Sequence, residues 1–199
     1  MYLDDALLYN QGYMISINDL DSPLFYLFDY DSRSFKINMS FQHFHQFYEI
    51  HILLSGRASH IIEGDYYTLQ PYDIVLLRPS LLHSTEYPAG GDCRRLIINF
   101  RVPDDSPVLH EMLQSCLQPF GAEVPIYRFT GETRAQAFSH LNAIFTLGKQ
   151  PMTPLTQQFI HCHFLHFLAT VAQHAGESSY EPQELSDSIT QKVYAVTSY

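Results

Sequence analysis

The 199-residue sequence has no tryptophan and is poor in basic residues. Its 11 Lys and Arg residues stand against 21 Asp and Glu residues, which gives a formal net charge of −10 at pH 7. An acidic chain repels the phosphates of nucleic acids, and no cluster of Lys and Arg interleaved with aromatic residues offsets this charge. We therefore do not expect these residues to contact DNA themselves.

Cysteine is also scarce. Cys93, Cys116 and Cys162 are odd in number and widely spaced, which argues against a disulfide framework and against a zinc knuckle. The N-terminal stretch MYLDDALLYN carries acidic residues and no basic segment, so it does not resemble a signal peptide. Because no apolar run approaches the roughly 20 residues of a membrane-spanning helix, we expect a cytoplasmic protein without a membrane partner.

Several catalytic motifs are missing as well. The sequence has no GxSxG, no P-loop and no GxGxxG, so it gives little support to nucleophilic catalysis or to a common nucleotide site. What it does contain is apolar and aromatic: hydrophobic residues make up 46%, and Tyr and Phe number 14 each. That composition suits a globular chain with a β-rich core.

The first half of the chain has the pattern of a β domain. Short apolar runs separated by turn residues predict strands up to about residue 103. Ser55-Gly56-Arg57 and Glu63-Gly64-Asp65 are predicted hairpin turns, because glycine tolerates the positive φ of a tight turn. Many short strands at this spacing favour an antiparallel barrel or sandwich. Residues 107 to 118 are predicted as a short helix, and residues 124 to 130 as one more strand at the barrel edge.

Two helices are predicted after the strands. Apolar residues at helical spacing mark a first helix from about residue 132, and a second from about Pro154 to His174. Their short connection predicts an antiparallel hairpin, which packs on the barrel, on a second copy of itself, or on both. The stretch GESSYEPQEL has the composition of a linker. The final stretch DSITQKVYAVTSY begins another amphipathic helix, within which the chain ends.

The stretch HFHQFYEIHILLSG is the chemically most informative part of the sequence. Alternate side chains of a strand share a face, so His43 and His45 point the same way, and Glu49 shares their parity if no bulge intervenes. Imidazoles and a carboxylate that converge on one point form a site for a divalent transition metal. His83, at the end of DIVLLRPSLLH, is the candidate further ligand from another strand.

The same residues carry a family resemblance. His43, His45, Glu49 and Gly56 resemble the first sequence motif of the cupins in both identity and spacing, and the resemblance extends over roughly residues 24–101. It implies a mainly β fold with some α, namely a cupin-type antiparallel β-barrel (a double-stranded β-helix) followed by the antiparallel helical hairpin. It also implies that three histidines and one glutamate could hold iron, nickel, manganese or zinc.

The second cupin motif is less complete. It is similar to Gly64, Pro71 and His83, but Tyr72 and Ser80 stand where the family usually has glycine. A late asparagine of the family is also replaced, by a tyrosine. The second motif is therefore a weaker signal than the first.

Within the cupins, the sequence of the predicted strands resembles that of the N-terminal domain of AraC-type transcription regulators. The order of barrel, hairpin and linker fits, and SITQKVYAVTSY looks like the first helix of that family's helix-turn-helix domain. The resemblance implies an N-terminal arm (1–23), a sensing barrel (24–130), a dimerisation hairpin (131–176), and a linker with the start of a truncated helix-turn-helix domain (177–199). DNA would be bound only through a C-terminal domain absent from this chain.

In this interpretation the barrel senses a small polar metabolite, for which a sugar is one candidate. The expected effector-binding residues are His43, His45, Tyr48, Glu49, Arg78 and His83. No cofactor is required, but the same three histidines and Glu49 could hold Zn, Ni, Fe or Mn. A purely structural role of these side chains is the third reading. His51 and His60 are expected to be ordinary surface or satisfied core residues.

The resemblance also favours a homodimer formed by the hairpin. The expected interface residues on the second helix are Ile160, Phe164, Phe167 and Val171. His163 and His166 share one face of that helix, and without a further ligand beside them we expect a polar shoulder of the apolar stripe. The rival function is a metal-dependent cupin enzyme, such as a dioxygenase, isomerase or epimerase acting on a small polar substrate.

Overall fold

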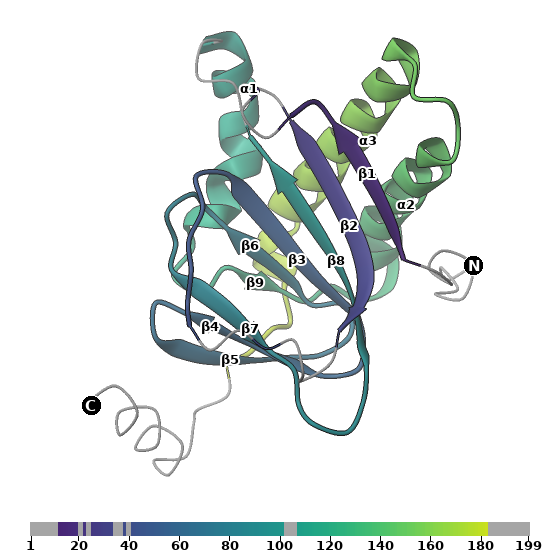
Figure 1. Ribbon diagram of the computed structural model, residues 1–199. Coiled ribbons are helices and arrows are strands. Elements are labelled where there is room, and N and C mark those ends of the chain that lie inside the picture. Colours follow the sequence, from purple (N-terminus) through teal and green to yellow (C-terminus); the bar gives the residue numbers. More distant parts are fainter. Residues whose placement is uncertain are drawn as a thin grey trace.

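The computed structural model describes residues 12–19, 22, 25–33, 38, 41–101 and 107–182. Two antiparallel sheets face each other, and helices cover the outer face of the larger one (Figure 1). The larger sheet has the order β1 (Tyr13–Ile17), β2 (Tyr26–Arg33), β8 (Cys93–Phe100), β3 (Tyr48–Ser55), β6 (Ile74–Leu77), β9 (Ile126–Tyr127). The smaller sheet has the order β5 (Asp65–Leu69), β4 (Ala58–Ile62), β7 (His83–Glu86).

The strand order confirms the predicted double-stranded β-helix. The chain passes from the large sheet (β3) to the small one (β4 and β5), returns with β6, crosses again with β7 and returns with β8. Strand β3 pairs with β6 and β8, while β4 pairs with β5 and β7. Such alternation between two facing sheets is the arrangement of jelly rolls and cupins.

The two predicted hairpin turns behave differently. Glu63 and Gly64, with φ of 51° and 97°, join the paired strands β4 and β5 and confirm that prediction. The turn Ser55-Gly56-Arg57 does not form a hairpin, because β3 and β4 lie in different sheets. Gly56 is nonetheless required there: a Cβ atom would lie 2.8 Å from the Cys93 sulfur, and φ is 87°.

Alternation along β3 divides the protein interior in two. Ile50 and Ile52 point toward the helices and join one apolar cluster, while Leu53 points between the two sheets and joins the other. Glu49 and His51 have the parity of Leu53 and therefore also face the space between the sheets. A shift of the strand register by one residue would therefore turn Glu49 and His51 away from the space between the sheets.

Three helices follow or interrupt the strands: α1 (Pro107–Leu117), α2 (Gly131–Gly148) and α3 (Pro154–Gln173). Short 3₁₀ turns cover Gln118–Gly121 and Ala175–Glu177. The predicted antiparallel hairpin is α2 and α3. Its second helix starts where Thr153 accepts a hydrogen bond from the backbone N–H of Thr156, with proline at the first turn. No helix of the described residues is long and apolar enough to cross a membrane.

The apolar stripe of α3 packs on the large sheet of the same chain. The ring of Phe164 lies 5.1 Å from that of Tyr26, 5.9 Å from Phe28 and 4.9 Å from Phe100. The four residues expected at a dimer interface, Ile160, Phe164, Phe167 and Val171, are all buried in this core. The assignment of these residues to a dimer interface was wrong. An apolar helix face does not reveal which surface it packs against, and here it buries the apolar outer face of the large sheet.

The two ends of the chain, where the N-terminal arm and the start of a helix-turn-helix domain were predicted, are only partly described. Residues 13–17 of the expected arm are strand β1, which pairs with β2 in the large sheet. The expected start of a helix-turn-helix domain, in residues 183–199, lies outside the described residues.

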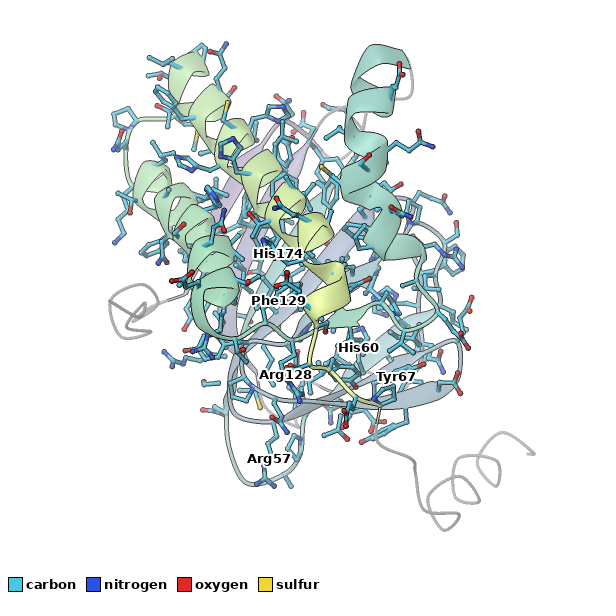
Figure 2. The ribbon with its side chains drawn as sticks, turned by 180° about the vertical axis from the view of Figure 1, so that it is seen from behind. Arg57, His60, Tyr67, Arg128, Phe129 and His174 are labelled. Atoms are coloured by element: carbon cyan, nitrogen blue, oxygen red, sulfur yellow. The ribbon has the colours of Figure 1, made fainter. Side chains whose placement is uncertain are left out.

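The beginning of the predicted linker is packed against the barrel. Arg128 donates two hydrogen bonds, of 2.6 and 2.7 Å, to the fully buried carboxylate of Asp73. Ser178 accepts a hydrogen bond from the backbone of Arg128, and the Arg128 guanidinium lies 5.2 Å from the ring centre of Tyr180. Figure 2 shows the chain running from the end of α3 past Arg128 toward the small sheet. The hydroxyl of Tyr180 donates to the carbonyl of Thr68 on β5, which completes the attachment.

Candidate functional site

Three of the four predicted metal ligands meet between the sheets. One ligand atom each from His45, Glu49 and His83 lies within 4.8 Å of the others. Glu49 is on β3 of the large sheet and His83 on β7 of the small one. The segment before β3 is held in place by two backbone hydrogen bonds between His43 and His83, of 2.8 and 2.9 Å. Residues distant in the sequence are thereby brought to one point.

Backbone carbonyls fix the tautomers of both imidazoles in this cluster. Nδ1 of His45 lies 2.8 Å from the carbonyl oxygen of Phe47, and Nδ1 of His83 lies 2.8 Å from that of Leu81. A carbonyl oxygen only accepts, so each Nδ1 carries a proton and donates it. In a neutral ring the lone pair is then on Nε2, the atom that faces the cluster. Hydrogen bonds to the other ring nitrogen orient histidines in the same way in metal sites.

The contact between His45 and Glu49 has a chemical consequence. Nε2 of His45 lies 3.1 Å from a carboxylate oxygen of Glu49, and Nε2 of His83 lies 4.0 Å from the other oxygen. A lone pair and a carboxylate oxygen repel each other unless a positive charge lies between them, which is either a second proton on His45 or a metal ion. Two nitrogens and a carboxylate are donors that suit Zn²⁺, Ni²⁺, Fe²⁺ and Mn²⁺. The residues present therefore fit a divalent transition metal.

The charge state of the cluster follows from its surroundings. Burial alone would raise the pKa of Glu49, but the hydrogen bond from His45 and the charges of His83, His45 and His51 outweigh it, so the pKa is lowered. Burial is the main cause that lowers the pKa of His83 and that of His43, against the opposing effect of Glu49. An anionic carboxylate beside the neutral imidazoles of His43 and His83 is the protonation pattern that metal binding requires.

The fourth predicted ligand, His43, lies beside the cluster and is not part of the set of mutually close ligand atoms. Its ring centre is 4.5 Å from that of His83 and 6.2 Å from that of His45. Its Nδ1 is buried and has no hydrogen-bond partner among the described residues. His43 thus lines the same interior space at a greater distance.

Two further histidines reach this space, and both were expected to be ordinary. His51 on β3 and His60 on β4 are 1% and 0% exposed, and their ring centres lie 5.3 Å apart. His60 is also stacked on His83, with ring centres 5.8 Å apart. Figure 2 shows His60 at the small sheet, which faces the strand that carries His51. The two rings extend the cluster deeper into the barrel.

These deep imidazoles are not satisfied by the protein. Both ring nitrogens of His51, and Nε2 of His60 and of His83, have no hydrogen-bond partner among the described residues. The other nitrogen of two of these rings is engaged: Nδ1 of His60 contacts the hydroxyl of Thr85 at 3.1 Å, and Nδ1 of His83 contacts the carbonyl of Leu81 at 2.8 Å. Each unpaired buried polar atom costs on the order of 1–3 kcal/mol. The expectation that His51 and His60 are surface or satisfied core residues was wrong.

Burial decides how these two histidines interact. It lowers the pKa of His51 to about 3, with a further contribution from Arg95, and it lowers the pKa of His60 well below its usual value. Both rings are therefore neutral at neutral pH. A neutral imidazole offers one hydrogen-bond donor and one acceptor, which suits a polar group such as a hydroxyl.

Two expected effector contacts are not brought to the cluster. Tyr48 has the opposite parity to Glu49, so its ring stacks on Phe100, 5.1 Å away, on the helix side of the sheet. There it lines a cleft of about 540 Å³ together with residues of α1 and the following turn. Arg78 is exposed at a strand end, with its guanidinium 3.7 Å from the carboxylate of Glu63. The ring of Tyr48 thus lies on the helix side of the large sheet and Arg78 at an exposed strand end, which differs from the expected place beside the histidine cluster.

A family model gives an independent comparison. The model described as the AraC-like ligand binding domain matches residues 36–142. This match includes the strands that carry the cluster and most of α2. No curated protein matches the sequence.

Several solved structures to which this chain is similar are described as cupins. One is a cupin protein from Bacteroides fragilis, with 22% identity and a TM-score of 0.38 over 48% of this chain and 80% of that chain. Another is an RmlC-like cupin with a double-stranded β-helix fold from Methanocaldococcus jannaschii, with 9% identity and a TM-score of 0.37 over 48% of this chain and 86% of that chain. At this level of similarity they say nothing about ligand or activity.

Proposed function

Because the chain belongs to the family of AraC-like ligand-binding domains, we propose that it is the effector-sensing and dimerisation part of a cytoplasmic DNA-binding transcription regulator. DNA contacts would be made by a further domain, since the net charge of −10 disfavours them here. The observation that supports the sensing role is the set of buried ring nitrogens of His51, His60 and His83 that have no hydrogen-bond partner among the described residues. Buried polar groups in native proteins are almost always paired, and a polar effector would supply the missing partners.

The cluster indicates the chemistry of the effector. Neutral His51 offers a donor and an acceptor, and the carboxylate of Glu49 only accepts. His60 offers one further donor or acceptor through Nε2, because its Nδ1 contacts Thr85. The side-chain oxygen of Asn99, which pairs with Glu49 in the β3–β8 register, is buried and unpaired among the described residues. A small molecule with several hydroxyl groups matches this mixture of donors and acceptors. We therefore propose a sugar or a related hydroxylated metabolite as the effector.

A divalent metal could form part of the same pocket. His45, Glu49 and His83 would hold it, with His43 as the additional imidazole beside them. The metal would act as a Lewis acid that attracts an oxygen atom of the effector. The tautomers set by the carbonyls of Phe47 and Leu81 favour this reading, and they equally favour the alternative of a metal-dependent cupin enzyme, such as a dioxygenase, isomerase or epimerase.

Elemental analysis of the purified protein, paired with His45→Ala, separates these two functions. Stoichiometric metal that is lost in the variant, together with turnover of a small polar compound, would favour the enzyme. Effector binding that survives in metal-free wild-type protein and raises its melting temperature favours the sensor.

The homodimer is proposed through a different face of the hairpin from the one first expected. Met152, Leu155 and Phe159 are 38%, 58% and 49% exposed, and the last two are four residues apart and so share one face of α3. Exposed apolar side chains in one stripe are typical of protein interfaces. Two copies that meet along this stripe would align two DNA-binding domains with two half-sites.

We propose that effector binding in the barrel is transmitted to the linker through the contacts of Asp73, Arg128 and Tyr180. Val75 pairs with His51 in the β3–β6 register, and Asp73 lies two residues before it. Asp73 in turn binds Arg128, which contacts Tyr180 at the start of the linker. The protein would have two states that differ in the position of this segment. An effector that binds one state more tightly than the other would shift the population toward that state and so transmit its presence.

A further inference from the structure

Three histidines gather on the helical hairpin, on the far side of the large sheet from the barrel interior. His140 belongs to α2, and His163 and His166 belong to α3, whose antiparallel packing is visible in Figure 1. Nδ1 of His140 lies 3.3 Å from Nδ1 of His163. The ring centre of His140 is 5.6 Å from that of His163 and 5.2 Å from that of His166.

The separation of His140 and His163 matches that of two imidazoles that share one metal ion, whereas the ligand atoms of all three histidines do not lie within 4.8 Å of one another as the side chains stand. Zinc bonds to imidazole nitrogen at roughly 2.0–2.1 Å, so two nitrogens at a tetrahedral angle lie about 3.3–3.4 Å apart. The centres of the two rings are then about 5 Å apart. A hydrogen bond between His140 and His163 would account for the two separations within this pair, but not for the imidazole of His166 beside them.

We propose that His140, His163 and His166 form a second metal site, independent of the barrel, that binds a divalent ion such as Zn²⁺, Ni²⁺ or Cu²⁺ and ties α2 to α3. Imidazole suits these ions. His166 is exposed, so a rotation of its side chain completes the set and ions enter from solvent. Three protein ligands leave a further position for water or for a donor from another molecule. The ion would restrain the hairpin that presents Leu155 and Phe159 to solvent.

The test is made on a protein whose barrel cluster has been disabled by His45→Gln and Glu49→Gln. Zn²⁺ is titrated into this metal-free protein by calorimetry, with equilibrium dialysis and elemental analysis to count the bound ions. We expect one bound Zn²⁺ per chain and a higher melting temperature with Zn²⁺, because the ion binds the folded hairpin. Adding His140→Gln or His163→Gln is expected to weaken binding at least tenfold and to abolish the rise in melting temperature.

Two further variants keep the test decisive. His166→Gln should weaken Zn²⁺ binding in the same way. Because His166 is exposed, this change should not disturb the packing between the helices. His174→Gln is the matched control, since His174 caps the end of α3 and pairs with Glu177 outside the cluster. It should leave Zn²⁺ binding unchanged. Absence of Zn²⁺ binding in the barrel-disabled protein would overturn the proposal, as would equal affinity in the control and in all three cluster variants.

Discussion

His51 and His60 face each other from two different sheets, with ring centres 5.3 Å apart and almost no exposure to solvent. Three of their four ring nitrogens have no hydrogen-bond partner among the described residues. A protein selected for stability alone would place apolar side chains here, because well-packed apolar residues replace unpaired polar ones at a gain. The pair is therefore best explained by the ligand that the barrel is proposed to bind.

Replacing His51 by leucine should stabilise the ligand-free protein by about 1–2 kcal/mol, since it removes two unpaired buried nitrogens and keeps a similar volume. Urea unfolding of wild type and His51→Leu measures the difference. Ile52→Leu, on the next position of β3, is the volume-conserving control and should not gain stability. A loss of stability in His51→Leu would show that the imidazole has a structural partner in the native protein.

Acid should weaken the fold in a defined pH window. Burial holds the pKa of His51 at about 3 in the folded protein, below the usual value of 6.5, and lowers the pKa of His60 as well. The unfolded chain thus binds protons that the folded chain does not. The free energy of unfolding should not depend on these two imidazoles above about pH 6.5. Below that pH it should fall by about 1.4 kcal/mol per pH unit for each of them.

Urea unfolding between pH 7.5 and pH 5, in buffer with a chelator, measures this slope. In His51→Leu the slope should be shallower by the contribution of one imidazole. An unchanged slope would mean that His51 is not the group that takes up the proton.

The ion pair between Arg128 and Asp73 should be important for stability, although neither residue belongs to the histidine cluster. Arg128→Leu deprives a fully buried carboxylate of the two hydrogen bonds from the guanidinium and leaves only that from the backbone N–H of Gln70, a loss that typically costs about 3–5 kcal/mol. Arg78→Leu is the matched control, because its pair with Glu63 is exposed and contributes at most about 1 kcal/mol. Both losses are read from chemical unfolding, and similar values for the two variants would contradict this account of Asp73.

The oligomeric state tests the exposed stripe of α3. Leu155→Glu with Phe159→Glu should convert a dimer into a monomer without lowering the stability of the chain, since neither side chain is buried. Gln158→Glu, exposed on the same helix, should leave the dimer intact. Sedimentation velocity across micromolar concentrations gives the answer, and a strict monomer in wild-type protein would count against the dimer.

Much of the fold could be predicted from local patterns. Short alternating runs bounded by turn residues indicated the strands, and helical spacing indicated α2 and α3. The spacing of His43, His45, Glu49 and Gly56 indicated the cupin-type barrel. Even where the second motif lacks its glycines the backbone keeps the expected shape, since Tyr72 and Ser80 adopt φ of 76° and 65°. These two positions bear the cost of a left-handed conformation without glycine.

The composition of the site could be predicted less well, because it depends on long-range pairing. The parity of a strand could have indicated His51, which is two residues from Glu49, and it could have excluded Tyr48. Nothing local marks His60, which reaches the cluster only because β4 lies in the facing sheet. The stripe of α3 was misassigned for the same reason, since an amphipathic pattern does not distinguish a sheet of the same chain from a second copy.

The most direct test of the sensing barrel is a thermal-shift screen of small hydroxylated metabolites and divalent metals, run in parallel on wild type and on His51→Leu/His60→Leu. A ligand that binds the folded state raises its melting temperature. We predict that at least one metabolite raises the melting temperature of wild type and leaves that of the double variant unchanged. The central claim would be contradicted if every stabilising metabolite acted equally on both proteins, or if none acted on wild type.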